Sequence, residues 1–155
     1  MAANIFRFVL SVVLALLVGT MFGIWVGFNP TSLSASAYVE QQQNAIRALN
    51  VLMPVLGSIV VLLTLVSAIL QRKDRKALVL LIVAAAFLVV SGLLTRFGNQ
   101  PINAIVMTWD VARPPANWTE LRDQWWGFHR LRTISGILAL VLIAWACVYP
   151  GRREK

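Results

Sequence analysis

The chain has 155 residues, of which 59% are apolar and only 13% charged, and its net charge is +8. Soluble domains contain about a quarter charged residues, so this balance excludes an ordinary water-soluble fold and favours a membrane protein. The basic residues stand at the ends of apolar runs, which indicates membrane topology, and we therefore expect no nucleic acid partner.

Four apolar runs can cross a bilayer, whose hydrocarbon core of about 30 Å needs roughly 20 residues per helix. We expect spans at about 6–28, 51–70, 77–96 and 130–149. The first run is too long for a signal peptide, whose apolar core has about 7 to 15 residues, so it should persist as a helix. The fourth has only 17 uncharged residues from Thr133 to Tyr149, which draws His129 and Arg132 to the interface or just below it. The prediction is an all-α membrane protein, a single four-helix transmembrane domain over residues 1–155.

Charge sets the expected orientation. One side of the four spans carries eight basic and two acidic residues, or +6, and the other carries six basic and four acidic residues, or +2. The more positive side is usually cytoplasmic. We expect both termini in the cytoplasm, a multi-pass protein of a bacterial-type inner membrane, and two loop or helix segments on the outer face. The basic residues of the positive side are Arg7, Arg72, Lys73, Arg75, Lys76, Arg152, Arg153 and Lys155.

The first outer segment, residues 29–50, opens with a turn at Asn29-Pro30. From Ser34 to Met53 the sequence has few helix breakers, so a helix should lead into the second span, which Pro54 should start or kink. Tyr38 and Gln42 are four residues apart and share a face of that helix. This face either contacts a ligand or is a solvated surface.

The second outer segment follows the third span, whose helix we expect Gly98 and Pro101 to stop. A second break at Pro114-Pro115 precedes Asn117, a favourable N-cap, with Glu120 in capping-box position. One helix of about 30 residues should therefore run from Trp118 into the fourth span.

A polar and aromatic stripe begins that helix. Its residues recur at intervals of four, three, four and three, so they share one helical face: Trp118, Arg122, Trp125, His129 and Arg132. Trp126 lies beside the stripe, and Arg96, Asn99 and Asn103 leave the third span at the same level. Ionisable groups at this depth favour a functional pocket. Alternatively, the tryptophans anchor the helix and the arginines extend towards head groups.

Metal chemistry has little support, because the chain has one histidine and one cysteine, Cys147. We predict no metal site and no cofactor. Haem held by His129 is an alternative.

The spacing Asn99-x-Pro101-x-Asn103, then Trp118 with Leu121-Arg122, then Trp125-x-x-Phe128-His129-x-x-Arg132-Thr133 resembles the anthrone oxygenase-like membrane family. Gly23, Pro30 and the helix around Tyr38 to Gln42 also resemble it. The resemblance implies a small four-span protein, some of whose relatives are linked to the oxidation of anthrones to anthraquinones by dioxygen.

Three functions follow as hypotheses. In the enzymatic one, His129 is a base, Arg132 and Arg96 hold an oxyanion, Asn99 and Asn103 donate hydrogen bonds, and the tryptophans stack on an apolar or aromatic substrate. The rivals are a non-catalytic ligand-binding or accessory subunit and a haem- or quinone-linked redox subunit. Expected partners are the lipid bilayer, the small ligand, and a second copy or a membrane complex.

Overall fold

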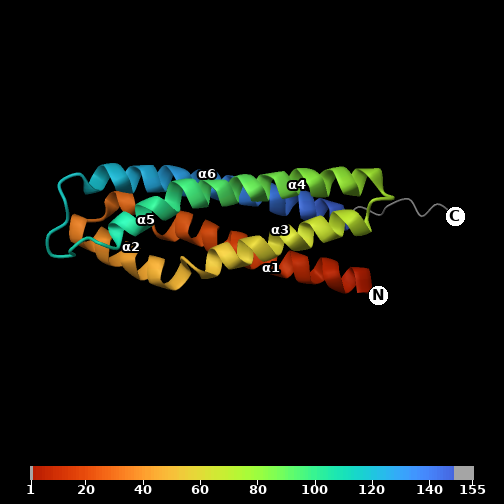
Figure 1. The fold of residues 1–155 in the computed structure, drawn as a ribbon, viewed down its shortest axis with the longest axis horizontal. Coiled ribbons are helices and arrows are strands. Elements are labelled where there is room, and N and C mark those ends of the chain that lie inside the picture. Colours follow the sequence, from red (N-terminus) through yellow and green to blue (C-terminus); the bar gives the residue numbers. More distant parts are fainter. Residues whose placement is uncertain (1, 149–155) are drawn as a thin grey trace.

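The computed structural model of the protein describes residues 2–148, with side chains from residue 5 onward (Figure 1). This part of the chain is helical and contains no strand, so the predicted all-α fold is confirmed. The final residue of the predicted fourth span and the basic residues Arg152, Arg153 and Lys155 lie outside it. The elements are α1 Ala2–Gly27, a 3-10 turn η1 Pro30–Ser32, α2 Ala35–Leu49, α3 Leu52–Leu70, α4 Arg75–Leu93, a π-helical segment η2 Leu94–Asn99, α5 Gln100–Val106 and α6 Trp118–Val148.

Four helical segments are long and apolar enough to cross a membrane, namely Ile5–Ser32, Leu52–Leu70, Arg75–Val106 and Trp118–Val148. Only 28% to 39% of their most apolar stretches is buried inside the chain. The outward-facing side chains include Leu16, Leu62 and Trp145, each 62% exposed. So much apolar surface is unfavourable in water and favourable in hydrocarbon, so the chain is a multi-pass membrane protein.

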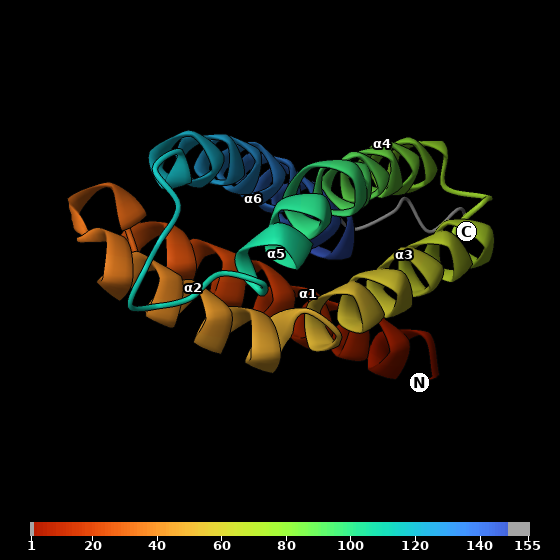
Figure 2. The ribbon, with the colours of Figure 1, turned by 60° about the vertical axis from the view of Figure 1, so that its left-hand side comes forward.

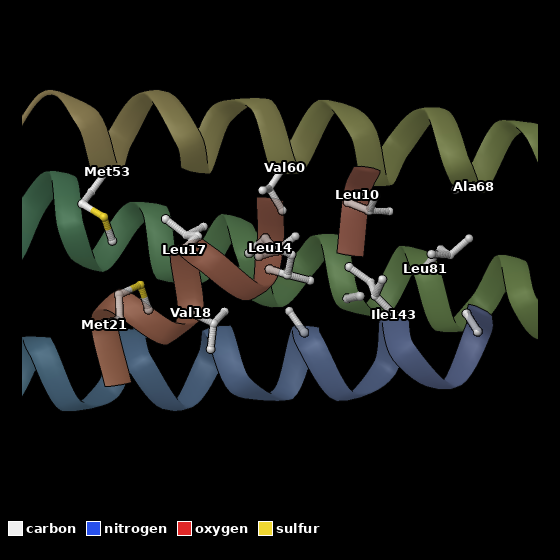
Figure 3. Close-up of a cluster of buried hydrophobic side chains, with 14 residues drawn as sticks. Leu10, Leu14, Leu17, Val18, Met21, Met53, Val60, Ala68, Leu81 and Ile143 are labelled. Carbon is white, nitrogen blue, oxygen red and sulfur yellow. The ribbon is translucent and has the colours of Figure 1, made fainter. Parts of the chain in front are cut away.

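The bundle is centred on α6, which packs most extensively against α4 and α1, while α3 packs against α4 and α1. Figure 3 shows the apolar core of these four helices, where Leu14 of α1, Val60 of α3, Leu81 of α4 and Ile143 of α6 are all buried. The start of α1 and the α3–α4 connection lie at one end (Figure 1), where Arg7 hydrogen-bonds Gln71. The opposite end holds α2, α5 and the first turns of α6.

Local caps explain two of the helix starts. The Asp74 carboxylate accepts hydrogen bonds from the amides of Lys76 and Ala77, at 3.1 and 3.2 Å, where α4 begins. The Ser34 hydroxyl accepts from the Ala37 amide where α2 begins. Each side chain satisfies amides that have no partner within the helix.

The expected stop of the third span at Gly98 and Pro101 was wrong. The helix passes through the π segment η2 and continues as α5 to Val106. In η2 the Gln100 amide donates to the Thr95 carbonyl, five residues back, so the chain accommodates one extra residue per turn before Pro101. Proline is tolerated there because it falls in the first turn of α5.

Gly98 does not end the helix but allows close packing. A Cβ at this position would lie 2.5 Å from a ring carbon of Phe128 on α6. The absence of a side chain therefore allows η2 and α6 to approach closely.

The predicted continuous helix from Ser34 to Met53 is also divided, because α2 ends at Leu49 and α3 begins at Leu52. At the break, the Asn50 side-chain oxygen accepts a hydrogen bond from Asn103 of α5 at 2.9 Å. The predicted long helix from Trp118 is a single helix of 31 residues.

Candidate functional site

A buried polar layer separates the apolar core from the opposite end of the bundle. His129 of α6 is fully buried, and Arg132, one turn further along the helix, is 8% exposed. The Nδ1 atom of His129 lies 3.3 Å from Nε and 3.0 Å from Nη2 of Arg132, and its Nε2 atom lies 3.1 Å from the Met21 carbonyl oxygen of α1. These contacts fit a neutral ring with its proton on Nε2, which donates to Met21 while Nδ1 accepts from Arg132. Neither ring nitrogen is then free to ligate a haem iron.

Arg132 is a buried cation with no acidic partner among the described residues. Its Nη1 atom donates to the Thr95 hydroxyl at 3.3 Å, and its other contacts go to His129. Among the described residues, no carboxylate lies within 4.0 Å of the guanidinium nitrogens. Buried charges are normally paired because desolvation is costly, so this group favours an incoming anion or a strong hydrogen-bond acceptor.

Two tryptophans hold the imidazole in place by stacking. The ring of Trp125 stacks on His129 with centroids 5.0 Å apart, and the ring of Trp126 is also nearly parallel to it, at 5.5 Å. Both tryptophans belong to a second apolar cluster with Ile46, Ile102 and Val106. The stack fixes the plane of the His129 ring.

Asparagine side chains link α2, α5 and α6 next to this layer. The Asn103 side-chain oxygen accepts from Trp125 Nε1 at 2.8 Å and from Gln42 Nε2 at 3.5 Å, while its amide donates to Asn50. Asn99 lies deeper, where its amide donates to the Trp125 carbonyl at 3.0 Å. Asn103 thus faces the side of α2, and Asn99 holds α6 against η2.

A cavity of about 580 Å³ opens between the α2–α3 junction, the end of α1, and the facing sides of α5 and α6. Predicted site residues that line it are Tyr38, Gln42, Asn103, Trp125 and Arg132. The side chains around them are mostly apolar, among them Ile24, Ile46 and Met53. A concave apolar site with a few convergent polar groups is typical of small-molecule binding.

The remaining predicted site residues lie elsewhere. Arg96 is exposed and lines a separate cavity, discussed below. Neither cavity is lined by Asn99, Trp118, Arg122, Trp126 or His129. Arg122 stacks over the Trp118 ring at 4.8 Å, and Trp118 in turn contacts Tyr38 at 5.6 Å between centroids. These two residues support the wall behind Tyr38.

A comparison with protein families matches residues 43–142 to the family described as anthrone oxygenase. The chain belongs to the anthrone oxygenase family. The match runs from α2 to α6 and includes the whole polar layer of α6, Asn99 and Asn103. Comparisons with curated proteins and with solved structures gave no match.

Other residues of this anthrone oxygenase family member at the site were not among the predicted ones. Thr95 contacts Arg132, Asn50 completes the asparagine network, and Glu40 lines the cavity at its exposed rim. Thr95 and Asn50 stand at the ends of apolar runs, where helix caps are also common, so their sequence pattern is not distinctive.

Proposed function

We propose that the 580 Å³ cavity binds a flat aromatic ketone or phenol of the anthrone type, and that the protein promotes its oxidation by dioxygen. The family description and the apolar lining support the substrate class. The buried Arg132 guanidinium, which has no carboxylate partner among the described residues, is the observation that carries the proposal, because it provides a preformed partner for a developing oxyanion.

The reaction needs no redox group on the protein. Loss of a proton from the acidic CH₂ carbon of an anthrone gives a carbanion whose charge is delocalised onto the carbonyl oxygen. That oxyanion would bind to Arg132 and to a donor such as Tyr38, which also lines the cavity. Dioxygen then accepts the electrons and forms a bond to the same carbon, and loss of water gives the quinone: anthrone plus O₂ yields anthraquinone plus H₂O.

The contacts of His129 support a positioning role better than a base role. Its Nδ1 lone pair is directed at Arg132 and its Nε2 atom at a carbonyl, so acceptance of a substrate proton would require Arg132 to move away. Among the described residues that line the cavity, one carries a carboxylate, and that residue is Glu40. Glu40 is therefore a second candidate for the proton acceptor.

The test uses purified protein in lipid nanodiscs with a hydroxylated anthrone. Quinone absorbance and oxygen consumption should rise together in a one-to-one ratio and faster than the uncatalysed reaction. Arg132→Leu should lower the rate by about 100-fold to 1,000-fold, the usual loss for an oxyanion partner, while Arg130→Leu on the exposed face should not. Wild-type turnover equal to the uncatalysed rate would refute oxidation.

A second candidate is a binding protein that uses the same cavity without turnover. It is favoured by the complete hydrogen bonding of His129, which leaves no free base there. Saturable binding of the anthrone without oxygen consumption would support this candidate over the enzyme.

We also propose that the cavity end faces the outside of an inner membrane, with both termini in the cytoplasm. The charge bias of +6 against +2 supports this orientation. It places the α3–α4 connection in the cytoplasm and α2 on the outer face.

A further inference from the structure

A second cavity of about 490 Å³ lies between α3 and α4, two of the candidate membrane spans. Figures 1 and 2 show the two helices diverging from their short connection towards the opposite end. Exposed apolar residues of the candidate spans, such as Leu62 and Val89, form part of its rim. In a membrane, the part of the opening that these residues border would face lipid.

Small side chains create this space. Gly57 and Ser58 of α3 and Gly92 of α4 line the cavity, and a Cβ added at either glycine would meet no atom within 4 Å. Glycine inside a helix costs up to about 1 kcal/mol relative to alanine. The two glycines leave the space between α3 and α4 unfilled.

The inner end of this groove adjoins the candidate site. Four residues line both cavities: Met53, Pro54, Thr95 and Arg132. The two spaces are therefore neighbours at these four residues. Figure 3 shows Met53 of α3 and Met21 of α1 pointing into the same gap between the helices. Methionine is unbranched and flexible, so Met53 can change rotamer at a small cost.

The two cavities open onto different environments. Exposed Glu40 and Asn44 line the first cavity, which fits an aqueous rim. The groove presents mostly apolar side chains, among them exposed Leu62 and Val89, together with exposed Arg96, and it reaches Arg132. A flat aromatic molecule dissolves preferentially in hydrocarbon, so its concentration is highest beside the groove.

We infer that the groove between α3 and α4 is the entrance through which the aromatic ligand passes from the bilayer to Arg132. The inference rests on the proposed function, because it assumes that the first cavity binds such a ligand. The ligand would slide past Gly57 and Gly92 and displace Met53. Its polar oxygen would then reach the guanidinium from the lipid side.

Kinetics can separate an entrance from a binding site. The probe is dihydroxyanthraquinone, which is coloured and stable in air, mixed rapidly with protein in nanodiscs while quenching of Trp125 is followed. Gly92→Trp and Gly57→Trp would fill the groove but leave the first cavity unchanged. Both variants should slow association and dissociation by the same factor, about tenfold or more, and leave Kd unchanged. Trp125→Phe identifies the quenching that reports on the site.

Gly19→Trp is the matched control, because Gly19 of α1 is also exposed, has open space at its Cβ and lines neither cavity. It should leave both rate constants unchanged. A graded version uses Gly92→Cys in a Cys147→Ser background, labelled with thiol reagents of increasing size, where the rates should fall as the label grows.

Three results would overturn the inference. Unchanged rates in both tryptophan variants would place the entrance elsewhere. A higher Kd with an unchanged association rate would make the groove part of the binding site. Equal slowing in Gly19→Trp would show a general effect of bulk. Absence of probe binding to the unmodified protein would instead refute the proposed function.

Discussion

The imidazole of His129 and the guanidinium of Arg132 form a hydrogen-bonded unit in which Nδ1 of the ring lies 3.0 Å from Nη2 and 3.3 Å from Nε. Because the other ring nitrogen is directed at Met21, the histidine serves as a fixed acceptor for the arginine. The orientation of Arg132 towards the cavity therefore depends on an acceptor atom at the position of Nδ1.

This relationship predicts different outcomes for two substitutions of His129. The side-chain oxygen of asparagine occupies nearly the same position as Nδ1, so His129→Asn should retain the contact with Arg132 and most of the oxidation rate. His129→Leu lacks the acceptor and should lose oxidation. A catalytic base would show another pattern, with both variants reduced by about 100-fold to 10,000-fold and the acidic limb of the pH–rate profile removed. Rates measured from pH 5 to 9 distinguish the two roles.

Tyr38 provides a prediction about stability in alkali. Its side chain is 1% exposed, its hydroxyl has no hydrogen-bond partner, and burial raises its pKa well above the ordinary value of 10.0. The folded state therefore retains the phenol proton while the unfolded state loses it above about pH 10, so stability should fall as the pH rises beyond that value. Tyr38→Phe should weaken this fall, as measured by thermal unfolding in detergent between pH 8 and 11.

The same variant tests ligand binding at neutral pH. Removal of an unpaired buried hydroxyl should leave stability unchanged or raise it by about 1 kcal/mol. If the hydroxyl donates to the ligand, Kd for dihydroxyanthraquinone should rise by about tenfold, as expected for one hydrogen bond. An unchanged Kd would remove Tyr38 from the binding set.

Gly98 and Gly92 should respond in opposite ways to alanine. At Gly98 the new Cβ would overlap the Phe128 ring, so Gly98→Ala should destabilise the protein by about 1 to 3 kcal/mol. At Gly92 the Cβ meets open space, so Gly92→Ala should be neutral or stabilise the helix by up to about 1 kcal/mol. Melting temperatures in the same detergent test the pair, and equal effects would contradict the close approach of η2 and α6.

Orientation can be measured by labelling. Lys73→Cys and Asn117→Cys lie in exposed connections at opposite ends of the bundle, and each is placed in a Cys147→Ser background. An impermeant maleimide should modify the first only after the membrane is opened and the second in intact cells. The reverse pattern would invert the proposed topology.

The length of the apolar runs was enough to predict the membrane-spanning helices but not every interruption in them. The start of α6 follows from the break at Pro114-Pro115 and the proline-free sequence after it. The continuation past Pro101 could not be predicted, because it depends on a π turn and on Phe128, which is distant in sequence.

Spacing and span boundaries predicted that the polar residues gather at one end of the bundle. They could not predict which of these residues contact one another. Helical spacing placed His129 and Arg132 on one face, and the structure pairs them. The same spacing added Trp118 and Arg122 to the stripe, although they support the wall behind Tyr38 instead of lining the cavity. Contacts with α1 and η2 decide these roles, and such tertiary contacts leave no periodic pattern.

The position of Arg132 has a consequence for how the protein is made. An arginine opposes the insertion of a membrane helix, by about 2.5 to 3.5 kcal/mol at the helix centre and by less towards the ends. Arg132 stands at the start of the apolar part of α6 and is buried, so it retains part of this cost. Arg132 donates a hydrogen bond to Thr95, and His129 contacts the Met21 carbonyl. Both partners belong to segments that are synthesised before α6. The last helix should therefore integrate stably only after α1 and the span formed by α4 and η2 are in place, and α6 expressed behind an unrelated leader helix should insert poorly.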